Sequence, residues 1–239
     1  MNLSLIIPVR NEENQIKVAL NKLNSFKKKI KDIEVIFIND FSDDKTEHLI
    51  KSFSKKKKFI RCYKNKKKGL GPAIELGILK SKGKFVCIFM SDMSDDLKDL
   101  LRYFNTIRSN NLDAIFGSRF MKNSVVKNYP LNKLIFNRIF NNFVRIIYLS
   151  EYNDFTNAFK IYRRIILLKL LPVVSENFNV FLELPLKIIS RKYKYKIIPI
   201  NWTNRKYGSS KFKIKELSSM YLFTLLYCLL EKILLKNKK

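Results

Sequence analysis

The chain has 239 residues, 46% of them hydrophobic, and a formal net charge of +28. Its length and hydrophobic content exclude an intrinsically disordered protein and suit one large domain with a substantial core. The charge alone would fit a nucleic-acid-binding protein, but most basic residues are lysines and the sequence has no zinc finger, basic zipper or aromatic RNA-binding signature, so we expect no nucleic-acid partner.

The first half of the chain alternates strands with helices. Apolar runs predict strands at residues 3–8, 34–39, 59–63, 85–89 and 113–116. The spacing of apolar and capping residues predicts helices near residues 12–28, from Asp43-Asp44 onward, from Gly69-Leu70-Gly71-Pro72 to about Lys82, and near residues 96–109. This alternation predicts an α/β fold with a mostly parallel central sheet and helices on both faces.

The pattern changes after Arg119. In residues 131–149, apolar side chains at helical spacing alternate with polar and basic ones, Lys133, Arg138 and Arg145 among them. This pattern predicts one or two amphipathic interfacial helices, suited to lying in a membrane interface, with ordinary packing on the core as an equal alternative. Further along the chain, we expect a helix at residues 178–191, a strand at residues 194–203 and a loop to Lys211.

The C-terminal run Leu217–Leu230 has no charged residue, but Glu231 ends it before the roughly 20 apolar residues that a membrane span needs. We expect residues 213–239 to form an apolar and basic helix that associates with a membrane or docks on a partner, such as a membrane subunit. Basic residues near anionic lipid headgroups contribute roughly 1 kcal/mol each. The sequence therefore predicts peripheral association with the cytoplasmic face of a membrane.

The cysteines indicate the compartment. Cys62, Cys87 and Cys228 lie far apart, with neither the spacing of a disulfide framework nor that of a metal site. This favours a reducing, cytosolic environment. Because a predicted strand begins almost at the first residue, we also expect no signal peptide.

Acidic residues follow two of the predicted strands. Asp40 comes directly after the second strand, and Asp92, Asp95 and Asp96 follow the fourth. The carboxyl ends of parallel strands meet at one edge of a sheet, where ligands bind. Hard oxygen ligands at that edge suit Mg²⁺ or Mn²⁺ that also holds a diphosphate. Capping of the next helix is the alternative role for Asp95 or Asp96.

Six short segments occur in a fixed order. They are Ile7–Glu13, Ile36–Asp44, Gly69–Gly71, Phe89–Asp96, Gly117–Arg119 and Arg205–Lys211. This ordered set resembles the inverting family 2 glycosyltransferases, which have a GT-A nucleotide-sugar-binding fold. Within that family, the chain is similar to the dolichol- and polyprenol-phosphate mannosyltransferases. The resemblance covers roughly residues 1–212, which we expect to form the catalytic domain.

The resemblance implies nucleotide contacts in the first three segments. Pro8, Arg10 and Glu12 match the first-strand motif that contacts the base and ribose. Asp40 matches a further base- or ribose-binding position, and Gly71 matches the turn that precedes the next helix. A nucleotide diphosphate sugar, either GDP-mannose or a UDP-hexose, is the implied donor.

The metal motif departs from the family pattern. Asp92 matches the second Asp of the family's Asp-x-Asp, which usually binds the metal, whereas Met90 replaces the first. The resemblance makes Mg²⁺ or Mn²⁺ the implied cofactor, with Ser94 and Asp95 as further candidate ligands. Asn39 and Lys84 also replace residues that are usually acidic in the family.

The remaining segments resemble the acceptor side of the family. Arg119 matches an arginine that meets the lipid phosphate, and Arg205 and Lys211 match a basic loop over the two phosphates. An Arg fork and a Lys point charge are typical phosphate ligands. Residues 154–160 resemble a further family segment, and Glu183 matches an acidic residue on the following helix.

The implied reaction is transfer of a hexose, with mannose as the first candidate, to a polyprenyl or dolichyl phosphate. Such an acceptor is already anionic near neutral pH and needs little general-base help, which fits a chain whose only histidine is His48. Two alternatives stay open. One is transfer to a hydroxyl of a cell-envelope glycan, with Asp95 or Asp96 as the base; the other is a non-catalytic nucleotide-sugar-binding paralogue, which Met90 favours.

Overall fold

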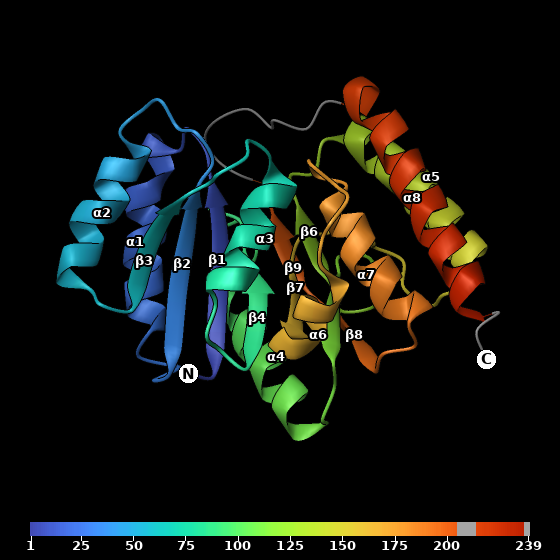
Figure 1. Cartoon of the computed structure of the whole chain (residues 1–239), viewed down its shortest axis with the longest axis horizontal. Coiled ribbons are helices and arrows are strands. Elements are labelled where there is room, and N and C mark those ends of the chain that lie inside the picture. The colour runs from blue at the N-terminus through green and yellow to red at the C-terminus, as the bar shows by residue number, and fades with distance from the viewer. Residues whose placement is uncertain (205–213, 237–239) are drawn as a thin grey trace.

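The structure is a computed structural model that describes residues 1–204 and 214–236. Within these residues, seven strands form one sheet in the order β3-β2-β1-β4-β7-β5-β8 (Figure 1). The strands are β1 (Leu3–Val9), β2 (Ile33–Asn39), β3 (Ile60–Lys64), β4 (Phe85–Ile88), β5 (Ala114–Ser118), β7 (Lys160–Arg163) and β8 (Tyr195–Pro199). Each of the five strands predicted in the first half of the chain is present.

The sheet is mostly parallel, as predicted, and β7 is the exception. β7 lies between β4 and β5 and runs antiparallel to both. The neighbouring pairs β1–β2, β1–β4, β2–β3 and β5–β8 are all parallel. The sequence did not predict β7, because a four-residue strand takes its place from its partners rather than from its own pattern.

Helices cover both faces of the sheet, which confirms the predicted layers (Figure 1). Along β1, Leu3, Leu5 and Ile7 join one apolar cluster, whereas Ile6 joins the other, as expected from the two-residue period of a strand. One face carries α1 (Glu13–Phe26), α2 (Thr46–Lys56) and α4 (Leu97–Ser109), and the other carries α3 (Leu70–Lys80), α6 (Arg164–Leu170) and α7 (Val180–Ser190).

The predicted strand at residues 194–203 is wrong as a single element. It divides into β8 and β9 (Asn201–Thr203), and β9 pairs with β6 (Val125–Lys127) in a separate two-stranded sheet. The division falls at Ile200, whose side chain is buried and whose backbone N–H donates to the carbonyl of Ser118 at 3.0 Å. The strand therefore changes partners at that residue.

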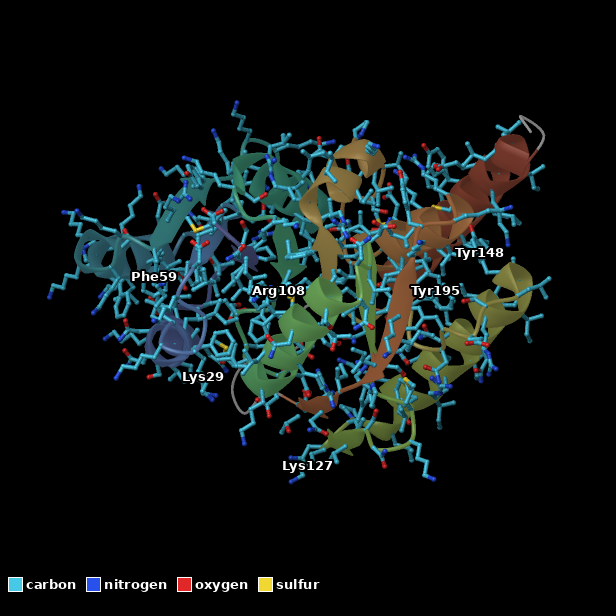
Figure 2. All side chains as sticks on the ribbon, turned by 90° about the horizontal axis from the view of Figure 1, so that it is seen from below. Lys29, Phe59, Arg108, Lys127, Tyr148 and Tyr195 are labelled. Atoms are coloured by element: carbon cyan, nitrogen blue, oxygen red, sulfur yellow. The ribbon has the colours of Figure 1, made fainter. Side chains whose placement is uncertain are left out.

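Two long helices lie side by side at one end of the molecule (Figure 1). They are α5 (Leu131–Tyr148), which is one continuous helix, and α8 (Ile214–Lys236). The rings of Phe140 and Tyr221 lie 5.4 Å apart, and Lys232 donates to the carbonyl of Tyr148, the residue that Figure 2 labels where the helices meet. In residues 1–204 and 214–236, no helix has both the length and the hydropathy that crossing a membrane requires.

Candidate active site

The loops that follow β1 and β2 are joined by hydrogen bonds at the carboxyl edge of the sheet. The Asn11 N–H donates to Ser42 Oγ at 3.1 Å, and the Asp43 N–H donates back to Asn11 Oδ1 at 3.1 Å. The Glu12 N–H donates to Thr46 Oγ1 at 2.8 Å. Asn11 has a φ of 52°, a left-handed conformation that Asn tolerates well. These bonds fix the two loops as one rigid rim.

The predicted nucleotide-binding residues of the first strand lie at this rim. Pro8 is buried within β1, opposite Ile38 of β2. Arg10 and Glu12 are half-buried just beyond the strand, and Glu12 is the residue from which α1 begins. The structure thus brings the three residues to the edge at which an open α/β sheet binds its ligands.

Asp40 is buried and organises the turn that leads into α3. Its Oδ1 accepts hydrogen bonds from Asn65 Nδ2 at 2.8 Å and from the Gly69 N–H at 2.9 Å. Its own N–H donates to the carbonyl of Val9 at 2.8 Å. Asp40 therefore connects the ends of β1, β2 and β3, a role that sequence reasoning did not foresee.

Gly71 lies against a segment from the other half of the chain. Its N–H donates to the carbonyl of Glu176 at 3.0 Å, and a Cβ at this position would lie 1.7 Å from the carbonyl oxygen of Ser175. Gly69, whose φ is 138°, makes the turn that permits this approach. The described contacts of Gly71 are thus with protein backbone.

The segment that Gly71 contacts, residues 172–176, is called the strap here. Glu183 of α7 holds it by accepting the N–H groups of Val174 at 3.0 Å and Ser175 at 2.8 Å. Lys187 pairs with Glu183 at 2.6 Å and donates to the carbonyl of Pro172 at 3.2 Å. Both side chains are buried. Glu183, which the sequence places among apolar residues, is therefore a ligand for backbone N–H groups.

Asp92 and Asp95 lie in the loop between β4 and α4. Asp92 is half-buried, and its Oδ1 accepts the Ser94 N–H at 3.1 Å. Asp95 is buried, and within the described residues its Oδ1 has no hydrogen-bond partner. Burial and the neighbouring charge of Asp92 raise the pKa of Asp95 to about 8. Asp96, in contrast, caps α4 by accepting the Lys98 N–H at 2.8 Å, which confirms the capping alternative for that residue.

These oxygens fit a cation that arrives with a diphosphate. The part of the chain that the structure describes contains no group of three or more His, Cys, Asp or Glu side chains arranged as a metal site. Mg²⁺, however, is usually bound through one or two carboxylates together with substrate phosphates and water. Asp92 and the unsatisfied carboxyl of Asp95 supply such donors, and Ser94 lies between them.

Arg119 is buried in an ion pair with Asp154. Its Nη2 lies 2.7 Å from Asp154 Oδ1, and its Nε and backbone N–H donate to Oδ2, each at 2.9 Å. Although burial acts to lower it, the pKa of Arg119 is raised by Asp154. The Arg119 guanidinium also lies 5.4 Å from the Tyr129 ring and 5.7 Å from the Trp202 ring. Two guanidinium nitrogens of Arg119, Nε and Nη2, are therefore hydrogen-bonded to Asp154.

Trp202 brings the Asp92–Asp95 loop and Arg119 together. Asp95 forms an isolated antiparallel bridge with Trp202, whose ring stands over the Arg119 guanidinium. The N–H of the next residue, Thr203, donates to the carbonyl of Ser94 at 3.0 Å. Arg205 and Lys211, the predicted basic pair of the following loop, lie outside the described residues.

Sequence reasoning missed two features of this region. It did not pair Arg119 with Asp154, and it did not foresee that Lys160 is buried and donates to the carbonyls of Phe155 and Phe181. The signal for Lys160 was a charged residue between apolar neighbours, which requires an internal partner when buried.

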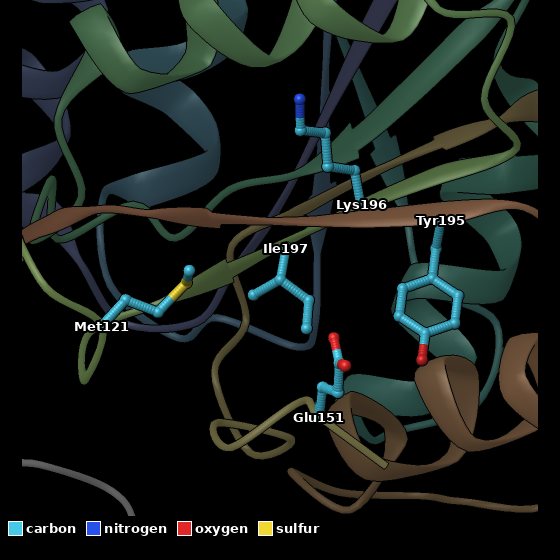
Figure 3. Close-up of a pocket in the computed structure, with 5 residues that line it drawn as sticks. All are labelled: Met121, Glu151, Tyr195, Lys196 and Ile197. Atoms are coloured by element: carbon cyan, nitrogen blue, oxygen red, sulfur yellow. The ribbon is translucent and has the colours of Figure 1, made fainter.

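A separate cavity of about 530 Å³ lies against β8 (Figure 3). Its lining residues are Met121, Glu151, Tyr195, Lys196 and Ile197. None of the residues predicted for the site is among them. We therefore do not assign the cavity to the candidate active site.

Comparisons with known proteins agree with the ordered segments. Residues 4–171 match the model of the family described as "Glycosyl transferase family 2". A dolichyl-phosphate beta-glucosyltransferase of Dictyostelium discoideum is 28% identical over 217 residues, covering 84% of this chain and 66% of that protein. The polyprenol monophosphomannose synthase of Mycolicibacterium smegmatis is 25% identical over 215 residues, covering 87% of this chain and 79% of that protein.

A longer relative and a solved structure extend the comparison. Glycosyltransferase AglD of Haloferax volcanii is 26% identical, but the match spans only 33% of its length. Glucosyl-3-phosphoglycerate synthase of Mycobacterium tuberculosis, in complex with Mn²⁺, UDP and glucosyl-3-phosphoglycerate, matches with a TM-score of 0.71 at 15% identity, covering 95% of this chain and 79% of that one. The chain belongs to glycosyl transferase family 2 and is a glycosyltransferase with the family's α/β fold.

Proposed function

We propose that this glycosyltransferase moves a hexose, with mannose as the first candidate, from a nucleotide diphosphate sugar to a polyprenyl or dolichyl phosphate, with inversion at the anomeric carbon. The names of the Dictyostelium and Mycolicibacterium relatives support a polyprenyl-type acceptor. The observation that carries the proposal is the meeting of the Asp92–Asp95 loop with the buried Arg119 beneath Trp202. The carboxylates of Asp92 and Asp95, which would serve the nucleotide-sugar donor, and the Arg119 guanidinium, which would serve the acceptor phosphate, then lie at the same edge of the sheet.

The donor, GDP-mannose or a UDP-hexose, would lie along the rim formed by the β1 and β2 loops. Pro8, Arg10 and Glu12 would line the base and ribose. Asp40 would position this subsite, because its Oδ1 already holds the turn at Gly69. Gly71 would act in the same way, by letting the strap pack under the turn.

Asp92, Ser94 and Asp95 would hold Mg²⁺ or Mn²⁺. The solved relative in complex with Mn²⁺ and UDP supports a divalent cation. When bound, such a cation neutralises charge on a leaving diphosphate. Asp92, which is half-buried, would face the ligand, and Asp95 would support it from the buried side of the loop.

The acceptor phosphate would lie on the basic side of the site. Arg119, held in place by Asp154, would supply a fixed positive charge, and Arg205 and Lys211 would close over the phosphate. The protein would then act by positioning and charge stabilisation, because a phosphate oxygen needs no deprotonation to attack. A lipid acceptor implies a peripheral protein on the cytoplasmic face of a membrane, alone or with a membrane subunit.

One observation favours a second candidate, transfer to a glycan hydroxyl. A hydroxyl acceptor needs a general base, and a base acts best when its pKa lies near the working pH. Asp95 Oδ1, which has no hydrogen-bond partner within the described residues, is the candidate base for such an acceptor. The nature of the acceptor therefore separates the two candidates.

The decisive experiment measures radiolabelled mannose passing from GDP-mannose into an organic phase that contains polyprenyl phosphate, with Mn²⁺ or with EDTA. Metal-dependent incorporation is the expected result. UDP-glucose and UDP-GlcNAc are tested in parallel, because either could be the physiological donor. Labelled product that stays in the aqueous phase with a glycan acceptor would support the second candidate. Silence with every donor would contradict both candidates and indicate a site disabled at Met90.

A further inference from the structure

The apolar side of α5 faces away from the core. Asn141, Val144 and Tyr148 are the buried residues of the helix, whereas the large apolar side chains are between 48% and 71% exposed. These exposed residues are Leu131, Ile135, Phe136, Ile139, Phe143 and Ile146. An amphipathic helix normally turns its apolar stripe to the core. Core packing, one of the two interpretations of this segment, is therefore wrong for these side chains.

The second helix, α8, is apolar on both sides. Tyr221, Thr224, Leu225 and Cys228 face the core. The opposite side exposes Leu222, Phe223, Leu226, Leu230, Ile233 and Leu234. A helix that is hydrophobic all round is normally buried, so the exposed side of α8 lacks the cover that its composition predicts.

The two exposed sides adjoin. Phe136 and Phe143 lie one turn on either side of Phe140, whose ring contacts Tyr221 of α8. The contact continues to the end of α5, where Lys232 lies over the Tyr148 ring. We call the six exposed residues of each helix together the α5–α8 face. A patch of this extent marks an interaction site rather than ordinary surface.

The charge around the α5–α8 face selects the partner. Residues 131–148 include no acidic residue, and Lys133 and Arg145 are the basic residues of α5 that are not on its inner side. On α8, Glu231 is paired at 2.7 Å with Arg191, the residue that follows α7. Apolar side chains bordered by basic ones are typical of helices that lie in the interface of an anionic membrane. A second copy of the chain, which also has a net charge of +28, would instead be repelled by the first.

The inner side of α5 connects this face to the candidate active site. Arg138 Nη1 donates to the carbonyl of Asn153 at 2.8 Å, and Asn137 Nδ2 donates to Thr156 Oγ1 at 2.8 Å. Asp154, the partner of Arg119, lies in the sequence between Asn153 and Thr156, the two residues that α5 holds. We propose that the α5–α8 face docks on an anionic phospholipid bilayer and thereby holds the Arg119 side of the site at the lipid surface. The part of this proposal that concerns the site rests on the proposed function.

The test is sedimentation of the full chain with vesicles of phosphatidylcholine, alone or mixed with phosphatidylglycerol. The expected result is binding to the anionic vesicles that weakens at high salt. Ile139→Ser with Phe143→Ser, on α5, should weaken it by about tenfold or more, and so should Phe223→Ser with Leu230→Ser, on α8. All four side chains are exposed, so these changes leave the core intact.

Val18→Ser and Leu79→Ser are the matched controls, because both side chains are exposed on other helices, α1 and α3. Binding of the α5 and α8 variants that equals that of the controls would overturn the proposal. Failure of the wild-type chain to bind anionic vesicles would also overturn it. A dimer detected by analytical ultracentrifugation and abolished in both variants would overturn it as well. Vesicle binding is measured without donor or acceptor, so a chain that binds vesicles but transfers no sugar refutes only the proposed function. Transfer to detergent-dispersed acceptor without vesicle binding refutes only the docking face.

Discussion

The backbone carbonyl of Ser175 lies 1.7 Å from the position that a Cβ on Gly71 would occupy. Because the obstacle is backbone held by Glu183, it cannot turn aside as a flexible side chain could. We expect Gly71→Ala to lower the free energy of unfolding in urea by about 1–3 kcal/mol, the usual cost of overpacking. Leu79→Ala, on the exposed side of the same helix, should change it by less than about 0.5 kcal/mol. Equal stability of the two variants would contradict the contact.

Asp92 is the residue on which metal-dependent turnover should depend. Asp92→Ala should reduce Mn²⁺-dependent release of the nucleoside diphosphate by about a hundredfold or more, the usual cost of losing one electrostatic stabiliser of the transition state. The melting temperature should change little, because Asp92 is only half-buried. Asp96→Asn is the matched control, since Asn caps a helix as well as Asp does. Turnover retained in Asp92→Ala would remove Asp92 from the metal site.

The buried pair of Arg119 and Asp154 should be worth much more than an exposed pair. Asp154→Asn leaves a buried guanidinium without a counter-charge, so we expect a loss of about 3–5 kcal/mol in the free energy of unfolding. Combining it with Arg119→Met should cost less than the sum of the single changes, because the partners are coupled. Glu176→Gln, which breaks the exposed pair with Lys67, should cost less than about 1 kcal/mol. Additive losses at Arg119 and Asp154 would show that the two residues act independently.

Lys160 should make stability depend on pH. Burial lowers its pKa to about 7, although Asp154 opposes the shift, whereas an unfolded lysine titrates near about 10.4. Between these values Lys160 of the unfolded chain binds a proton that Lys160 of the folded chain does not, so the contribution of Lys160 to stability should rise as the pH increases above about 7. Below about pH 7, Lys160 is protonated in both the folded and the unfolded chain, so its contribution to the free energy of unfolding stays constant.

The measurement is the free energy of unfolding in urea at several pH values between about 7 and 9. Lys160→Met should make the slope less positive than that of the wild type, because it removes the titrating group at this position. Lys84→Met, at an exposed position, should leave the slope unchanged. A slope in Lys160→Met that equals the wild-type slope would show that Lys160 does not contribute to the pH dependence.

Much of the fold could be predicted because its elements carry their own patterns. The strand predicted at residues 34–39 is β2, and the helix predicted near residues 12–28 is α1, each within a few residues of its bounds. β7 and α6 escaped prediction. β7 has four residues, and its place between β4 and β5 is decided by contacts with strands far away in the sequence. Local pattern contains no information about such partners.

The candidate site likewise has features that the sequence could predict and features that it could not. The order of the six segments predicted the family, which the family match over residues 4–171 confirms. The capping role of Asp96 was also among the predicted alternatives. The approach of Ser175 to Gly71 and the pairing of Arg119 with Asp154 each join segments that are distant in the chain. The roles of Pro8, Arg10, Glu12, Arg205 and Lys211 toward ligands stay predictions.

The position of β7 has a consequence for how the protein is made. β1, β2, β3 and β4 are contiguous parallel neighbours, and all of them lie within the first 88 residues. β5 leaves the ribosome soon afterwards, but its place in the sheet is next to β7, which ends at Arg163. The half of the sheet that contains β1 to β4 can therefore form early in translation, whereas β5 has no neighbouring strand to join until β7 has been synthesised.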